Sequence, residues 1–189
     1  MSYDVYKILS YLLSPPLIAL CVTLVFSLLS PIGLGSIDVF SSIAIGSVFL
    51  ALIPIVFIFY FYKGDIEIKK KEDRTKLYLV SIVCYVTSSA IFWVLNSHVM
   101  FLISISYVFV TSVVAVINLF WKISVHTAGT AGPITALVYA FGIKLVPLYA
   151  LVLLVFWTRL KIKAHSFLQL VTGAVVAIFI TSIVYIVLW

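Results

Sequence analysis

Charged side chains are scarce in this chain. Asp, Glu, Lys and Arg together make up 10% of the 189 residues, whereas hydrophobic residues make up 65% and the mean hydropathy is +1.30. A water-soluble domain needs a more polar composition than this one. The composition therefore predicts one polytopic membrane domain over residues 1–189, an all-α bundle of six to seven transmembrane helices with no separate soluble module.

Cysteine is rarer still, and it gives no signal of a disulfide or of a metal site. Cys21 and Cys84 both lie inside apolar segments, and no spacing typical of metal ligands occurs. The net charge of +6 does not indicate nucleic-acid binding, because the basic residues cluster at segment ends, where they meet lipid headgroups or an anionic substrate. The expected partners are therefore the bilayer and a membrane lipid, and nothing in the sequence points to a particular oligomeric state.

Seven apolar segments follow one another along the chain. A transmembrane helix needs about 20 mostly apolar residues, and the segments run approximately over residues 6–29, 39–62, 77–95, 100–121, 124–142, 145–157 and 165–189. The first is too long for a signal peptide and lacks a small-residue cleavage pattern. Ser14-Pro15-Pro16 interrupts it, which predicts a kink or a late helix start. The fifth and sixth segments are short for spanning.

Basic residues are distributed unequally between the two membrane faces that this segment count predicts. If successive segments alternate in direction, one face receives the N-terminus, the polar stretch 63–76 and the junctions near residues 122–126 and 158–165. Every Lys and Arg except Lys144 lies on that face. The positive-inside rule then predicts a multi-pass protein of the cell membrane with this face in the cytoplasm. The imbalance persists when Arg74, Lys122 and Arg159, which are candidates for a site, are set aside.

The same face collects the residues that are best suited to chemistry. Imidazole transfers protons and acts as a nucleophile near neutral pH, and guanidinium binds phosphate with several donors. The candidates from the three pieces of sequence are Arg74, Lys122, Ser124, His126, Arg159 and His165. Cations for phosphate oxygens together with two imidazoles predict a phosphoryl-transfer site without a metal. His126 also lies near a helix start, where free backbone N–H groups favour an anion.

From Lys122 onward the spacing of these residues resembles the membrane branch of the type 2 phosphatidic acid phosphatase superfamily. The third motif of that family is Ser-Arg, five residues, His, three residues, Asp, and Thr158-Arg159, His165 and Gln169 match its spacing. The second motif is Pro-Ser-Gly-His, of which Ser124 and His126 are retained. The order of the motifs and their shared face carry more weight than any single one.

The first motif of that family, Lys, six residues, Arg-Pro, is matched only by Arg74, and the resemblance covers about residue 63 to the C-terminus. Thr75 follows Arg74 in place of Pro, and Glu67 occupies the lysine position, so that Lys69, Lys70 or Lys71 would have to substitute. The resemblance implies an integral membrane lipid phosphatase that works without a metal or other cofactor.

The resemblance also implies a role for each residue. His165 would attack phosphorus to form a phosphohistidine, and His126 would act as general acid and base. The phosphate oxygens would be held by Arg74, Ser124 and Arg159, with Lys122 as an extra cation. The implied substrate is a phosphate or diphosphate monoester of a lipid, with a polyprenyl diphosphate favoured over a phosphatidate-like or phosphatidylglycerophosphate-like lipid.

Gln169 is the main departure from the family pattern, because it replaces the Asp that orients the nucleophilic histidine. Four residues apart on a helix, His165 and Gln169 would share a face, and a Gln carbonyl can fix the tautomer without stabilising the imidazolium by charge. A carboxylate from the polar stretch could take over, the candidates being Asp65, Glu67, Glu72 and Asp73. The alternatives are a slow enzyme or a catalytically impaired relative that binds or transports anionic lipids. A metal-dependent prenyl or phosphatidyl transferase ranks lower, because the chain has no clustered aspartates.

Overall fold

The structure is a computed structural model that describes residues 3–62, 68 and 71–189. These residues form nine α-helices, one π-helical segment and one 3-10 segment, with no strand among them, as the composition predicts. In chain order the elements are α1 (Tyr3–Leu12), α2 (Pro15–Leu29), α3 (Val39–Ser47), η1 (Val48–Leu52), α4 (Ile53–Tyr62), α5 (Lys71–Val94), α6 (His98–Phe120), α7 (Val125–Phe141), η2 (Ile143–Tyr149), α8 (Ala150–Lys161) and α9 (Phe167–Leu188).

Within the described residues, five helical runs are long and apolar enough to cross a membrane, namely Val39–Tyr62, Asp73–Val94, His98–Phe120, Ile143–Lys161 and Phe167–Leu188. The bent pair of α1 and α2 makes a sixth if it counts as one span. The predicted multi-pass helical architecture is confirmed at five or six spans. Of the seven apolar segments, the fifth corresponds to α7, which has 17 residues and falls short of the 18-residue length of a candidate span.

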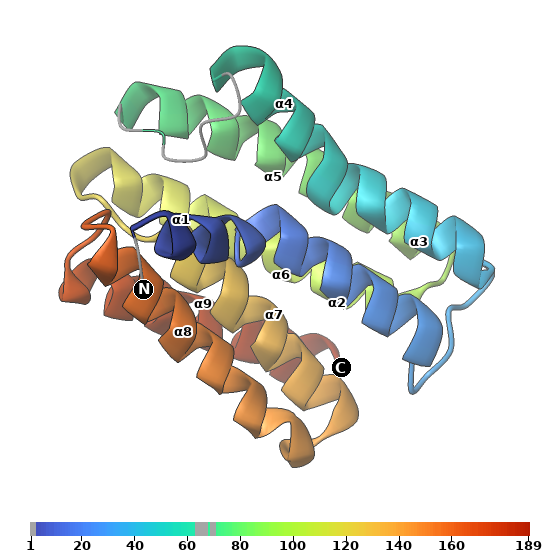
Figure 1. The fold of residues 1–189 in the computed structure, drawn as a ribbon. Coiled ribbons are helices and arrows are strands. Elements are labelled where there is room, and N and C mark those ends of the chain that lie inside the picture. Colours follow the sequence, from blue (N-terminus) through green and yellow to red (C-terminus); the bar gives the residue numbers. More distant parts are fainter. Residues whose placement is uncertain (1–2, 63–67, 69–70) are drawn as a thin grey trace.

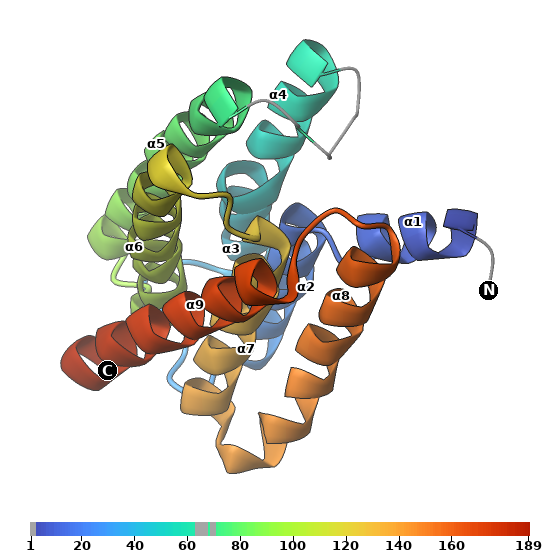
Figure 2. The same cartoon turned by 90° about the vertical axis from the view of Figure 1, so that its left-hand side faces the viewer.

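The break predicted in the first apolar segment is present. Ser14 has an extended backbone and occupies the N-cap position of α2, whose first two positions are Pro15 and Pro16. Proline suits a helix start because its missing N–H would be unpaired there anyway. The axes of α1 and α2 consequently differ by 41°, and α1 leads away from the end of the bundle beside α8 (Figure 2).

The third segment begins earlier than its hydropathy indicates. Helix α5 starts at Lys71, six residues before the apolar run, so Arg74 lies in its first turns instead of in a loop. Hydropathy marks where the apolar residues begin, whereas Lys, Glu and Arg are good helix formers that extend a span beyond the membrane. The remaining residues of the predicted polar loop, with Asp65, Glu67, Lys69 and Lys70, lie outside the described residues, as do the side chains of Lys71 and Glu72.

Helix α7 lies at the centre of the helical assembly and is buried along most of its length. A Cβ atom on Gly129 would lie 2.6 Å from Cβ of Pro15, and one on Gly132 would lie 3.2 Å from Oγ1 of Thr181. Small residues on α7 therefore let α2 and α9 approach its backbone closely. Figure 1 shows the α6–α7 connection, the α8–α9 turn and α1 at the same end of the bundle.

Candidate anion-binding site

A cavity of about 400 Å³ lies at this end of the bundle. We call it the polar cavity. Five of the predicted site residues line it: Arg74, Lys122, His126, Arg159 and His165. They come from the start of α5, the α6–α7 connection, the start of α7, the end of α8 and the α8–α9 turn. The structure thus brings together the three pieces of sequence that the topology predicts on one face.

The charge of the polar cavity has one sign. Its described lining includes four basic side chains, those of Arg74, Lys122, Arg159 and Lys163, and no acidic one. Such a concentration of positive charge around a partly enclosed space attracts anions strongly, because low-dielectric walls weaken screening. Phosphate fits this arrangement, since guanidinium groups offer it several donors at once.

Arg74 and His126 both line the polar cavity and have buried nitrogen atoms for which the described residues provide no hydrogen-bond partner. They are Nε and Nη1 of Arg74 and both ring nitrogens of His126. The His126 side chain is only 3% exposed. A buried donor without a partner costs about 1–3 kcal/mol, so the Arg74 nitrogens and the single N–H of the neutral His126 imidazole favour a bound group that accepts hydrogen bonds.

Backbone contacts join the second and third motifs. The Ser124 N–H donates to the backbone oxygen of Gln169 at 3.2 Å, which ties the start of α7 to the first turn of α9. Gly173, one turn further along α9, makes this approach possible. A Cβ at that position would clash with the backbone oxygen of Ser124 and with Oγ1 of Thr127. Local packing therefore fixes His126 relative to the α8–α9 turn.

Ser124 itself is not among the described residues that line the polar cavity. It is fully buried, and its Oγ accepts a hydrogen bond from the Thr127 N–H at 3.4 Å as the N-cap of α7. Its backbone oxygen accepts a second bond, from the Thr127 hydroxyl at 3.0 Å. In this structure Ser124 orients the helix that carries His126 and does not face the polar cavity.

Arg159 is held by a residue that the sequence interpretation missed. Its Nη1 donates to Oγ of Ser10 on α1 at 2.7 Å, and the Arg159 side chain is 3% exposed. Helix α1 docks on α8 through this bond and through an edge-to-face contact of the Tyr6 and Trp157 rings, whose centroids are 5.0 Å apart. No motif marks Ser10, so only the folded structure reveals the contact.

His165 lies just before α9 and not on it, because Ser166 is the N-cap of that helix. The expectation that His165 and Gln169 lie on one face of a helix is therefore wrong, because His165 is outside the helix. The two side chains are nevertheless in contact. Gln169 folds back in a capping box, and its Oε1 accepts the Ser166 N–H at 3.1 Å. The same oxygen lies 3.2 Å from Nδ1 of His165.

This contact determines the tautomer of His165. Because Oε1 of Gln169 is an acceptor, Nδ1 of the neutral imidazole must be the donor, and the lone pair is left on Nε2. Burial, followed by the positive charges of Arg159 and Lys122, lowers the pKa of His165 to about 3, against the opposing effect of the Gln169 hydrogen bond. His165 is therefore neutral at physiological pH, as a nucleophile must be.

Lys122 fastens the turn that carries His165. Its Nζ donates to the backbone oxygen of Ala164 at 2.7 Å. This bond ties the segment between α6 and α7 to the α8–α9 turn. In that turn Lys163 adopts a left-handed backbone with φ of +54°, and the Ala164 N–H donates to the Arg159 oxygen at 3.0 Å. Lys122 thus contributes both a charge to the polar cavity and a link between two of its walls.

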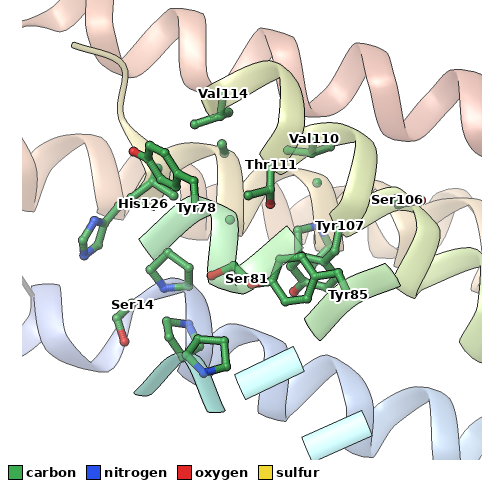
Figure 3. A pocket seen from close by; sticks show the side chains of 18 of the residues that line it. Ser14, Tyr78, Ser81, Tyr85, Ser106, Tyr107, Val110, Thr111, Val114 and His126 are labelled. Carbon is green, nitrogen blue, oxygen red and sulfur yellow. The ribbon is translucent and has the colours of Figure 1, made fainter. Parts of the chain in front are cut away.

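A second, smaller cavity of about 90 Å³ adjoins the polar one, and its lining is largely apolar (Figure 3). We call it the apolar pocket. Among the described residues, four line both cavities, namely Leu77, Tyr78, Val125 and His126. Tyr78 is a further residue that the sequence interpretation missed. It lies one helical turn after Arg74, so an earlier start of α5 would have placed both side chains on one face.

Comparisons with known protein families, with curated proteins and with solved structures find no match for this chain.

Proposed function

We propose that this protein is an integral membrane lipid phosphatase that hydrolyses a phosphate or diphosphate monoester of a lipid through a phosphohistidine on His165. The observation that carries the proposal is the convergence of two histidines and four basic side chains on one cavity. The motif spacing that resembles the type 2 phosphatidic acid phosphatases supports the same reading. A substrate with a long apolar tail suits a chain that has five or six candidate spans.

The reaction proceeds in two displacements. Nε2 of His165 attacks phosphorus, and the bond from phosphorus to the leaving oxygen breaks as the imidazolium of His126 gives that oxygen a proton. Burial and the charge of Arg159 lower the pKa of His126, so His126 must take up this proton when the anionic phosphate binds and offsets the positive charge. The lipid alcohol, or the lipid monophosphate from a diphosphate, then leaves. In the second step His126 removes a proton from water, which attacks the phosphohistidine and releases inorganic phosphate.

Arg74, Arg159 and Lys122 neutralise the phosphate oxygens while charge moves to the leaving group. Their positive charge also keeps His165 neutral and nucleophilic until the anionic substrate arrives. Ser124 contributes by capping the helix that carries His126. Binding the phosphate through Ser124 as well would require the phosphate to reach its buried hydroxyl, which could donate its O–H while still accepting the Thr127 N–H.

The test is a phosphate-release screen on the purified protein in nanodiscs. The substrates are a polyprenyl diphosphate, a phosphatidate and a phosphatidylglycerophosphate, each with and without excess chelator. We expect release that survives the chelator and that His165→Asn lowers by about a thousandfold or more. His98→Asn is the matched control, because it removes a histidine that is remote from the site. His98 is the first residue of the 23-residue helix α6, and the opposite end of that helix, about 35 Å away, lies near the site.

One observation favours a second candidate function, a lipid-binding or lipid-transport protein that keeps the anion site. Gln169 is neutral, so the imidazolium that forms on His165 during reaction lacks a negatively charged partner there. Binding of lipid phosphates without phosphate release from any of the three substrates would favour this second function over the phosphatase.

The polar cavity faces the cytoplasm in this proposal, because the described basic residues other than Lys144 lie at its end of the bundle. Single cysteines at Lys161 and at Lys144, introduced after Cys21 and Cys84 are replaced by Ser, test the orientation. A membrane-impermeant maleimide should label Lys144→Cys from outside intact cells and Lys161→Cys only after lysis. The reverse pattern would place the site outside.

A further inference from the structure

We propose that the apolar pocket holds a single hydrocarbon chain of the lipid whose phosphate occupies the polar cavity. The inference rests on the proposed function in one respect, which is that the headgroup is a phosphate. It goes further by specifying the tail of the substrate. The tail is one slender chain, such as a polyprenyl or single alkyl chain, and not a pair of acyl chains.

The first argument is continuity between the two cavities. Tyr78 and His126 line both of them, and Figure 3 shows these two side chains at one end of the apolar pocket. Tyr85 and Tyr107 lie at its other end in the same view. A molecule with its phosphate beside His126 would therefore direct its chain toward those two tyrosines.

The second argument is size. Tyr78 and Tyr85 are seven residues apart on α5, which corresponds to about 10 Å along the helix. A volume of about 90 Å³ over this length is small, since an engineered cavity that holds one benzene molecule measures about 150 Å³. The apolar pocket therefore has room for the first part of one thin chain, and not for two.

The third argument is the chemistry of the wall. Four of the lining residues are prolines: Pro15, Pro16, Pro54 and Pro133. Proline has no backbone N–H, so these positions present carbon atoms to the occupant without adding a donor. Valines and an isoleucine of α6 line the pocket as well, namely Ile103, Val110 and Val114. These carbon surfaces favour a hydrocarbon occupant over water, although the lining also includes the hydroxyls of Tyr78, Tyr107 and Thr181, for which the described residues provide no partner.

The experiment uses the full-length protein in nanodiscs and decyl phosphonate, a probe that cannot be hydrolysed at its carbon–phosphorus bond. A version with a diazirine at the chain end is photo-crosslinked, and the labelled peptides are identified by mass spectrometry. We expect label on α5 and α6 near Tyr85 and Tyr107. Label confined to lipid-facing positions such as Val116, which is 57% exposed, would overturn the proposal.

A pair of variants on α6 gives an independent readout. Thr111 lies between Tyr78 and Tyr107 in Figure 3, so Thr111→Phe should fill the apolar pocket and lower the affinity for decyl phosphonate by about tenfold or more. Val116→Phe adds the same ring on the exposed side of the same helix and should leave the affinity unchanged. Equal affinities of the two variants would contradict the proposal.

These measurements remain interpretable whatever the phosphate-release screen finds. If the wild-type protein binds and crosslinks the probe in the apolar pocket but releases no phosphate, the proposed function fails and the tail site stands. If it releases phosphate but the crosslinks avoid the pocket, the proposed function stands and the tail site fails.

Discussion

Arg159 donates a 2.7 Å hydrogen bond from Nη1 to Oγ of Ser10, although the two residues are 149 positions apart in the chain. The bond connects the first helix to the centre of the proposed phosphate site. Because α1 leads away from the end of the bundle beside α8 (Figure 2), any movement of α1 would act directly on Arg159. The N-terminal helix is thus part of the site even though no predicted site residue lies in it.

Ser10→Ala should weaken substrate binding more than turnover. Removal of the hydroxyl leaves Arg159 without this partner, and a hydrogen bond to a charged group is worth about 1.5–3 kcal/mol, which corresponds to about a tenfold rise in KM or more. Steady-state kinetics on the preferred lipid would separate KM from kcat. Ser10→Thr keeps a hydroxyl and should restore the wild-type KM. If Ser10→Thr raised KM as much as Ser10→Ala, the size of the side chain at this position would determine substrate binding, and the hydrogen bond would not.

Gln169→Glu should accelerate phosphate release. The substitution keeps the side-chain length and the capping box, for which Glu is a preferred partner, and it adds a negative charge next to Nδ1 of His165. That charge raises the pKa of His165 from about 3 and stabilises the imidazolium of the transition state. Single-turnover measurements of phosphohistidine formation would show the change.

Gln169→Ala is the matched comparison, because it removes both the acceptor and the capping box. It should slow the reaction and lower the free energy of unfolding by about 1 kcal/mol. If Glu and Ala slow phosphohistidine formation equally, the neutral amide would be a requirement of the site, and a charged partner for His165 would be excluded.

The helical architecture was predictable because hydropathy records burial in lipid directly. The break before Pro15 and the span Val39–Tyr62 were both foreseen at their observed positions. The count of seven apolar segments did not give the number of spans. Helix α7 is apolar because it is buried among other helices, and it is too short to count as a span. The early start of α5 at Lys71 was missed for the opposite reason, since polar helical turns carry no hydropathy signal.

The convergence of Arg74, His126, Arg159 and His165 on one cavity followed from counting segments and sides. What the sequence could not reveal are contacts that depend on the packing of distant helices. Ser10 and Tyr78 belong to this group, and so does the fully buried position of Ser124.

Lys122→Met should raise the pKa of His165, because Lys122 is one of the positive charges that lower it. The same change removes the bond to the Ala164 oxygen and should loosen the turn that holds His165. An NMR titration of the His165 imidazole would report the direction of the shift. Lys161→Met is the control, since Lys161 is exposed and lies outside the described lining of the polar cavity. Equal titration curves for the two variants would contradict the assignment.

Acidification should destabilise the protein in part through His165. Its pKa is about 3 in the folded state and 6.5 in the unfolded state. Above pH 6.5 the imidazole is neutral in both states, so it adds no pH dependence. As the pH falls from 6.5 toward 3, only the unfolded state takes up this proton, and the free energy of unfolding decreases. Thermal unfolding in detergent should therefore show a smaller loss of stability on acidification for His165→Gln than for the wild-type protein. Identical losses would mean that His165 titrates normally in the folded state.

Gly173→Ala should separate the two halves of the site without changing any of the proposed catalytic residues. The added Cβ would clash with the Ser124 oxygen and with Oγ1 of Thr127, so α9 must move away from the start of α7. Overpacking of this kind costs about 1–3 kcal/mol of stability. The Ser124 to Gln169 backbone bond joins the same two segments, so His126 and His165 should lose their relative positions and phosphate release should fall. Val175→Ala is the control, because Val175 is 57% exposed on the same helix. Gly173→Ala protein that unfolds at a lower temperature but keeps wild-type kcat would show that α7 and α9 can separate without disturbing the chemistry.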